Sequence, residues 1–327
     1  MNYRRLGKTN LNISEISLGT WQLGGGWGQP FDDHKAQAVL DAAVDQGINF
    51  LDTADVYSDR QSERKVGQFV GQRREQLYIG TKIGRRISPH VVEGYTPEIL
   101  SSYVDEALAN TGLEYLDLVQ LHCPPTGVYF RDELFEQLQV IRDSGKVRHF
   151  GVSVEKVEEA IQASQYDIVE SVQIIFNMFR VKPLDECFRK LKEKDIGVIV
   201  RVPLASGLLT GKMTPETEFV KDDHRFFNRN GEVFDKGETF SGVPLEAGFA
   251  AVDALTEHFD RSRLNQFALR WVLMFDEVST VIPGASRLEQ VADNVTAATL
   301  AAFTEAEMQV VSDVYDRFIR SHVHQNW

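Results

Sequence analysis

The chain has 327 residues, of which 43% are hydrophobic, and a formal net charge of −13. This length suits one α/β barrel of about 250 residues with insertions, and the acidic balance argues against a nucleic-acid partner, because phosphates attract basic surfaces. Only Cys123 and Cys187 occur, so no disulfide framework is expected and a reducing cytoplasm is the simplest setting. The first residues lack the apolar core of a signal peptide, and no run approaches the roughly 18 apolar residues that a membrane span needs. We therefore expect a cytoplasmic protein without a membrane partner.

The predicted elements alternate between strands and helices. Residues 3–13 are expected to form a hairpin about a Gly-Lys-Thr-Asn turn, which would plug the N-terminal end of a barrel. Short apolar runs have the composition of parallel strands that are covered on both faces. These runs lie at 16–21, 48–53, 77–83, 116–122, 149–154, 170–176, 197–202 and 278–282. Helical patterns with capping residues lie between or after them, at 34–46, 61–71, 96–111, 131–144, 246–258, 263–275, 287–300 and 304–318.

This alternation predicts a (β/α)8 barrel of the TIM type, with the N-terminal hairpin as a plug and extra C-terminal helices, in a single domain over 1–327. Thr304 and Glu307 form a predicted capping box at the start of the last helix. The rival architecture is a doubly wound dinucleotide fold, which requires Gly-x-Gly-x-x-Gly after its first strand. Gly24–Gly28 does not have that spacing and is interpreted as a loop between a strand and a helix.

One segment, 205–245, breaks the alternation and shows no sustained period. A loop of this length inside a compact domain is usually functional or disordered. It follows the seventh predicted strand, so it begins at the edge of the barrel where catalytic groups lie. We expect part of 213–245, around Phe226, Phe227 and Phe234, to close over a cofactor or substrate and exclude water.

Four polar residues lie at or just beyond the ends of three successive predicted strands: Asp52, Tyr57, Lys82 and His122. Taken singly, each has a commoner explanation, such as a helix cap, a surface aromatic, a solvated lysine or a core histidine. Taken together they suit carbonyl reduction, which needs an acid for the developing alkoxide. A tyrosine has a pKa near 10, and a neighbouring ammonium should lower it. An aspartate would hold that lysine charged, and the histidine would fix the carbonyl oxygen or relay the proton.

The set Asp52, Tyr57, Lys82 and His122 resembles the catalytic tetrad of the aldo-keto reductase family in order and spacing. The resemblance spans nearly the whole chain and is nearest to the bacterial, potassium-channel-subunit-like and general-stress branches. It implies NADP(H)-dependent reduction of aldehydes or ketones to alcohols, and the reverse. It assigns Tyr57 as the acid, Lys82 and Asp52 as its tuning groups, and His122 as a substrate-orienting residue. Trp21, Tyr57 and His122 are the implied substrate-binding residues.

The resemblance also implies cofactor contacts at later strand ends. Ser153 and Gln173 stand where the family binds the nicotinamide carboxamide, although Val154 replaces the usual Asn. Arg201 stands where many relatives have an aromatic that stacks on the nicotinamide, a task that a planar guanidinium can also perform. The stretch 203–212 looks like the family's loop beneath the pyrophosphate. The remaining implied cofactor contacts are Thr20, Trp21, Asp52, Pro203, Leu204, Ser206, Gly207 and Leu209.

The stretch 282–294 resembles the family's adenosine-phosphate segment and leads into a helix, whose N-terminus favours anions. Gly284 and Gln290 stand where many relatives have Lys and Arg. Arg287 is the implied partner of the 2′-phosphate of NADP, while Gln290 and Asn294 are placed beside the adenine. The simpler interpretation of Arg287 is a solvated arginine at a helix start.

Two functions from different classes remain open. The favoured one is an NADPH-dependent reductase of small carbonyl compounds, and the other is an NADPH-binding redox-sensing regulatory subunit with little turnover. A phosphosugar isomerase barrel is a weaker third. The substrate and the oligomeric state are open, although a monomer is possible, and no metal is expected because the 322–324 histidine pair is weak evidence. The aromatic residues predicted at the pocket mouth are Trp21, Trp27, Phe31, Tyr57, Tyr129 and Phe130.

Overall fold

A computed structural model describes residues 1–25 and 29–327, and the N-terminal hairpin is present in it. Strand β1 (Tyr3–Arg5) pairs antiparallel with β2 (Asn12–Ser14). Gly7 starts the connecting turn with φ +50°, and a Cβ atom there would lie 2.2 Å from the backbone nitrogen of Gly197. Only glycine therefore allows the hairpin to approach the start of the seventh barrel strand this closely.

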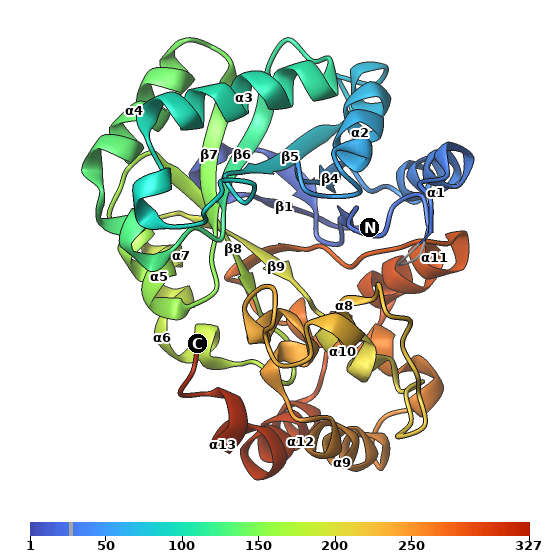
Figure 1. Cartoon of the computed structure of the whole chain (residues 1–327). Coiled ribbons are helices and arrows are strands. Elements are labelled where there is room, and N and C mark those ends of the chain that lie inside the picture. The colour runs from blue at the N-terminus through green and yellow to red at the C-terminus, as the bar shows by residue number, and fades with distance from the viewer. Residues whose placement is uncertain (26–28) are drawn as a thin grey trace.

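The main sheet has eight parallel strands in sequence order, as predicted. Isolated parallel bridges join Ile16 to Val281 and Gly19 to Gly284, which connects the first strand to the last and closes the barrel. Figure 1 shows the strands at the centre with helices around them. The strands are β3 (Leu18–Gly19), β4 (Phe50–Asp52), β5 (Tyr78–Ile83), β6 (Leu116–His122), β7 (Val147–Ser153), β8 (Val169–Ile175), β9 (Gly197–Arg201) and β10 (Val278–Val281).

The helices cover the outside of this barrel. Between the strands lie α1 (Asp33–Asp45), α2 (Gln61–Gly71), α3 (Pro97–Thr111), α4 (Asp132–Asp143), α5 (Val157–Ala163), α6 (Lys182–Glu186) and α7 (Phe188–Glu193). After β9 come α8 (His224–Phe227), α9 (Leu245–Thr256) and α10 (Leu264–Val272), and after β10 come α11 (Leu288–Thr296), α12 (Glu305–Val314) and α13 (Arg320–Val323). Figure 1 shows α9, α12 and α13 grouped at one edge of the molecule.

Several helix boundaries follow from capping chemistry. The Thr96 hydroxyl accepts from the backbone of Ile99, with Pro97 at the first helical position. The predicted capping box of Thr304 and Glu307 is present at the start of α12. The predicted helix 304–318 is correct in place, but its last residues, from Tyr315 on, form a π-helix rather than an α-helix. The predicted helix 287–300 is shorter, because α11 ends at Thr296 and a 3-10 turn follows.

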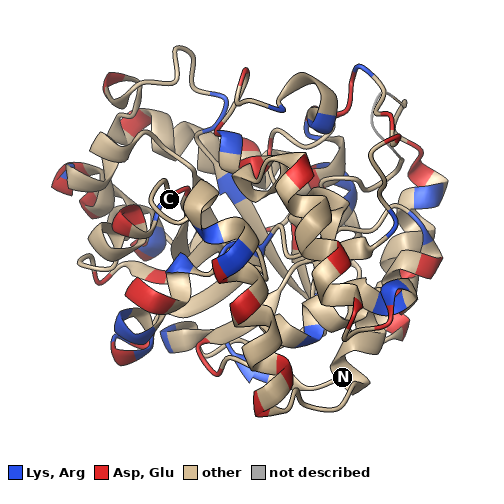
Figure 2. Ribbon diagram, turned by 90° about the horizontal axis from the view of Figure 1, so that it is seen from below, with Lys and Arg blue, Asp and Glu red and all other residues tan. Residues whose placement is uncertain are grey.

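The interior of the barrel is apolar at the end that the hairpin plugs. Leu6 and Ile13 from the hairpin join Phe50, Leu118 and Ile199 in one buried cluster. This packing excludes water from that end, so the polar groups of the barrel interior lie toward the opposite end. Among the helices that the structure describes, none is long and apolar enough to cross a membrane. Figure 2 shows acidic and basic residues interspersed over the outer helices.

Candidate active site

The structure brings three of the four candidate catalytic side chains into direct contact. The ammonium of Lys82 on β5 lies 2.5 Å from Oδ1 of Asp52, which ends β4, and 3.1 Å from the hydroxyl of Tyr57. It also donates to the backbone oxygen of Thr53 at 3.0 Å. Lys82 and Asp52 are each only 1% exposed. The lysine therefore sits between a carboxylate and a phenol, in a place that water hardly reaches.

The second oxygen of Asp52 is held by two buried glutamines. Gln173 donates to Oδ2 at 2.8 Å and Gln120 donates to it at 3.3 Å. The contact of Gln173 with Asp52 was not foreseen, and Gln120 was missed altogether. Gln120 lies two residues before His122 on β6, so side-chain alternation along a strand places both on one face. That alternation is the signal that could have found it.

The pKa values of Lys82 and Tyr57 are both raised, although burial and the strongest neighbouring charge oppose each other in each case. Burial lowers the pKa of Lys82, but the adjacent Asp52 and Tyr57 raise it more, so the lysine stays charged. Burial raises the pKa of Tyr57, and the Lys82 ammonium opposes this effect without cancelling it. The sequence predicted a lowered tyrosine pKa. The direction differs because the sequence gives no measure of how far the phenol is removed from water.

His122, at the end of β6, completes the group. Its ring centroid lies 6.2 Å from that of Tyr57, edge to face. Burial lowers its pKa well below the ordinary value, and the positive charges of Lys82, Arg85 and Arg201 lower it further. Its Nδ1 atom is buried and has no hydrogen-bond partner within the described parts of the chain. The histidine is therefore a neutral ring at physiological pH, suited to hydrogen-bonding rather than to carrying charge.

The residues predicted to bind the nicotinamide lie level with His122 across the sheet. His122 pairs with Ser153 on β7, and Ser153 pairs with Gln173 on β8. Thr20, which follows β3, donates its backbone N–H and its hydroxyl to the backbone oxygen of Asp52 at 3.0 and 2.9 Å. These positions place the predicted contacts on one rim around the candidate catalytic residues.

Part of the long segment 213–245 reaches this rim. The ring of Trp21 lies 6.1 Å from that of Tyr57, 4.9 Å from that of His224 and 6.4 Å from that of Phe234. Phe234 was predicted to lie here, whereas His224 was not. Phe227 packs edge-on against Phe234 at 6.0 Å. The segment therefore contributes a partly aromatic wall beside the tyrosine.

One of the other residues predicted at the pocket mouth lies in the core instead. Tyr129 is fully buried in the core and donates its hydroxyl to the backbone oxygen of Ser153 at 3.3 Å, so its placement at the mouth is wrong. Phe130 is 63% exposed, and Phe226, which was predicted in the closing segment, is 53% exposed. Trp27 falls outside the described residues, as does part of the glycine-rich loop that contains it. The hydrophobicity of an aromatic residue does not show whether its ring packs in the core or lines a pocket.

Arg201, at the end of β9, is held by acids rather than left free to stack. It donates to Oε2 of Glu238 at 2.5 Å and to the backbone oxygen of Val154 at 2.8 Å, and it lies 3.7 Å from Oε2 of Glu155. Candidate ligand atoms of Cys123, Glu155 and Glu238 lie within 4.8 Å of one another. The Arg201 guanidinium already supplies positive charge to this group, so a metal ion would compete with it.

The predicted pyrophosphate loop has an unusual backbone. Ala205, Ser206 and Gly207 have φ values of 46°, 53° and 102°, and such successive left-handed residues curve backbone N–H groups into an anion-binding concavity. The hydroxyl of Ser206 accepts from the backbone of Phe240 at 3.0 Å and donates to the backbone oxygen of Glu238 at 3.2 Å. The long segment is thus anchored to this loop. Pro203 and Leu209 are buried beside it, and Leu204 is half-buried.

The predicted adenosine-phosphate residues lie at the start of α11. Arg287 is exposed and immediately precedes the helix. Gln290 accepts from the backbone of Ser286 at 2.8 Å, and Asn294 donates to the backbone oxygen of Gly284 at 3.4 Å, so both brace the 284–286 segment. Among the described residues other than its chain neighbours, the atom nearest to the position that a Cβ of Gly284 would take is the backbone oxygen of Gly19 at 3.8 Å, which leaves the Gly284 backbone accessible.

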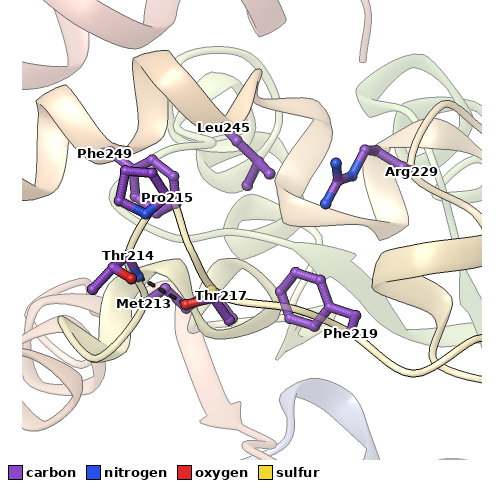
Figure 3. Close-up of a pocket in the computed structure, with 8 residues that line it drawn as sticks. All are labelled: Met213, Thr214, Pro215, Thr217, Phe219, Arg229, Leu245 and Phe249. Carbon is purple, nitrogen blue, oxygen red and sulfur yellow. Dashed lines mark hydrogen bonds between the residues drawn. The ribbon is translucent and has the colours of Figure 1, made fainter.

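A cavity of about 120 Å³ lies away from the tetrad. Figure 3 shows it between the beginning of the long segment and the start of α9. Its lining residues are Met213, Thr214, Pro215, Thr217, Phe219, Arg229, Leu245 and Phe249. It shares no residue with the tetrad or with the predicted cofactor contacts.

Comparison with known proteins is consistent with this geometry. Residues 15–316 match the model of the family described as "Aldo/keto reductase family". The chain belongs to the aldo/keto reductase family. This aldo/keto reductase is 30% identical, over 95% of each chain, to the "Uncharacterized oxidoreductase YqkF" of Bacillus subtilis. It is 28% identical, over 91% of each, to a "Probable voltage-gated potassium channel subunit beta" of Arabidopsis thaliana.

Two further relatives bear on cofactor use. The "NADH-specific methylglyoxal reductase" of Escherichia coli is 29% identical over 89% of this chain and 92% of its own length. Among solved structures, the holo form of the aldo-keto reductase AKR11C1 of Bacillus halodurans superposes with a TM-score of 0.77, at 26% identity over 96% of each chain. These likenesses agree with the predicted family and barrel, and they leave the choice between NADP and NAD open.

One prediction follows from the buried acid Glu155 of this aldo/keto reductase. Burial, and then repulsion from Glu238, raise its pKa to about 8. The unfolded chain releases this proton near pH 4.3, so stability falls as pH rises from there to about 8. Glu155→Gln should remove that loss and raise the free energy of unfolding by about 2–4 kcal/mol at pH 8, with little change at pH 5.

Chemical denaturation at the two pH values measures this difference. The exposed Glu257→Gln on the outside of the molecule is the control and should leave the pH dependence of stability unchanged. A Glu155→Gln variant that is destabilised equally at both pH values would show that Glu155 is ionised and paired throughout.

Proposed function

We propose that this aldo/keto reductase interconverts aldehydes or ketones and alcohols with NADP(H), using Tyr57 as the general acid and base. The observation that carries the proposal is the contact of one buried ammonium, that of Lys82, with both the Asp52 carboxylate and the Tyr57 hydroxyl. We further propose a single-domain cytoplasmic enzyme that acts on small carbonyl compounds without a metal.

The bound coenzyme supplies the hydride, and the residues of this chain handle the proton and the oxygen. Tyr57 donates its hydroxyl proton to the alkoxide that forms in the reduction direction. Lys82 stabilises the phenolate that remains, because an adjacent positive charge favours the ionised form. Asp52 keeps the lysine charged and fixed in place. His122 is neutral, so it can donate a hydrogen bond to the carbonyl oxygen without adding charge.

Features of this chain fit a pyrophosphate-bearing nucleotide. The left-handed run at 205–207 and the open backbone at Gly284 are two places where a phosphate or ribose can approach the main chain closely. The start of α11 adds a helix N-terminus, which attracts anions. Arg287 and this terminus lie together on the same segment, which supports a 2′-phosphate contact there.

The role of Tyr57 as the general acid can be tested by Tyr57→Phe, which keeps the aromatic ring and removes the hydroxyl proton. Turnover of a model aldehyde should fall by a factor of about 10² to 10⁴, while NADPH affinity should change little. Stopped-flow reduction and fluorescence titration of NADPH measure the two quantities. Near-native turnover in this variant would mean that another group is the acid.

The coenzyme preference can be tested at Arg287. A hydrogen bond to a charged group contributes about 1.5–3 kcal/mol, so Arg287→Ala should weaken NADPH binding by roughly one to two orders of magnitude and leave NADH almost unchanged. Arg189→Ala, on a side chain that is 85% exposed on α7, is the matched control. Isothermal titration with each coenzyme gives the affinities. Equal losses for both coenzymes would show that Arg287 shapes the helix start and does not bind the phosphate.

The long segment 213–245 is proposed to act as a lid. It is anchored at Ser206 and Glu238, and its rings face Trp21 beside the tyrosine. NADPH should slow tryptic cleavage within the segment by about tenfold or more, because bound ligand favours the closed form. Mass spectrometry of timed digests locates the cuts, with cleavage elsewhere in the chain as the internal control. Equal cleavage rates in both conditions would make the segment an ordinary surface loop.

A second candidate function is a coenzyme-binding regulatory subunit with little turnover. It is favoured by the similarity to a protein described as a probable voltage-gated potassium channel subunit beta. The two functions differ in turnover: a sensor binds NADPH tightly but reduces a panel of aldehydes at a negligible rate. The complete tetrad, with its lysine in contact with the tyrosine, supports the enzyme.

A further inference from the structure

The turn that follows Tyr57 has an unfavourable backbone. Ser58, Asp59 and Arg60 have φ values of 48°, 47° and 69°, so three consecutive residues other than glycine are left-handed. Side chains oppose this conformation, and it persists only where surrounding contacts hold it. Tyr57 itself lies in a loop, outside the hydrogen-bonded register of the barrel. Its position therefore depends on what holds this turn.

One carboxylate oxygen holds the turn from the side of α3. Oε1 of Glu106 accepts from Nε of Arg60 at 2.6 Å and from Nη1 of Arg86 at 2.8 Å. Arg60 ends the left-handed run, and Arg86 follows β5, the strand that carries Lys82. Glu106 thus connects the turn after the tyrosine to the segment after the lysine.

Arg86 also reaches the chain before the tyrosine. Its Nη1 lies 3.5 Å from Oδ2 of Asp55, whose side chain is buried. Burial, and then repulsion from Glu63, raise the pKa of Asp55 to about 7, with Arg86 opposing and Glu106 adding to the rise. Asp55 is therefore only partly charged near neutrality. Glu106, which accepts two charge-assisted hydrogen bonds, is the stronger anchor for the arginine.

We propose that Glu106, with Arg60 and Arg86, positions Tyr57 for proton transfer. Hydrogen bonds hold the loop three residues after the tyrosine, at Arg60, and Arg86 lies at ion-pair distance from Asp55, two residues before it. They set where the Tyr57 hydroxyl lies relative to the Lys82 ammonium. Their hydrogen bonds and ion pairs connect them to one another and to Asp55, so they act through the backbone of the loop. This proposal rests on the proposed role of Tyr57 as the acid.

The test compares two neighbouring acids on α3. Glu106→Ala removes the anchor, and Glu106→Gln keeps its shape while removing the charge. Asp105→Asn is the matched control, because Asp105 is the neighbouring acid on α3 and its exposed side chain pairs with Lys146, which lies just before β7. Steady-state kinetics with a model aldehyde and NADPH, circular dichroism and thermal unfolding are measured for all of them.

Misplacing a reacting group by about 1 Å can cost roughly 10²-fold, so Glu106→Ala should lower kcat by about 10- to 100-fold. Glu106→Gln should fall between Glu106→Ala and the wild type, and Asp105→Asn should match the wild type. The KM for NADPH should change by less than about twofold, because the coenzyme contacts lie elsewhere. The pH dependence of kcat should also shift toward higher pH, since a longer distance between Tyr57 and Lys82 weakens the lowering effect of the ammonium on the tyrosine pKa.

Two results would overturn the proposal: an unchanged kcat in Glu106→Ala, or a kcat that falls no further than in Asp105→Asn. If Glu106→Ala does not fold, Glu106→Gln and Arg86→Lys decide by the same criteria. The outcome is separate from that of the proposed function. If Tyr57→Phe retains the turnover of the wild type, the acid role is refuted. If Tyr57→Phe loses turnover but Glu106→Ala keeps its kcat, only the positioning role is refuted.

Discussion

The buried ammonium of Lys82 is the interaction on which the rest of the site depends. A charge removed from water is unfavourable unless it is paired and hydrogen-bonded, and removing one partner of such a pair typically costs about 3–5 kcal/mol. Here Asp52 provides the opposite charge, and the backbone of Thr53 and the hydroxyl of Tyr57 accept the other two hydrogen bonds. The tyrosine thus completes the hydrogen-bonding of the lysine, and the lysine in turn governs the acidity of the tyrosine.

The barrel supplies the conditions for this arrangement. The hairpin plug closes one end of the barrel with apolar side chains, so water does not reach the ion pair of Lys82 and Asp52 from that end. Strand register then brings Asp52, Lys82 and His122 to the open end from three adjacent strands. Burial there lowers the pKa of His122 well below its ordinary value, and the positive charges of Lys82, Arg85 and Arg201 lower it further. Acids from distant segments balance them, among them Glu238 from the long segment.

How much of the structure could be predicted from the sequence depends on how far apart in the sequence the interacting residues lie. Strands and helices could be predicted, because each depends on a local pattern, and the contact of Asp52 with Lys82 and Tyr57 follows from the meeting of strand ends; the catalytic roles were assigned from the resemblance to the family and stay a prediction. Gln120 was accessible to the same reasoning and was overlooked. His224, Glu238 and Glu106 could not be predicted, since their contacts join segments far apart in sequence through irregular backbone. The direction of the Tyr57 pKa shift failed for a similar reason, because burial is a property of the folded chain.

Ionisation of Tyr57, followed by NMR in protein labelled with ¹³C at tyrosine Cζ, tests the central claim most directly. The Tyr57 resonance is assigned with the Tyr57→Phe variant, and the wild type is compared with Lys82→Met. The account predicts a tyrosine pKa above its ordinary value near 10 in the wild type, and a further increase when the ammonium is lost. An identical titration in the two proteins would contradict the coupling of lysine and tyrosine on which the proposed chemistry rests.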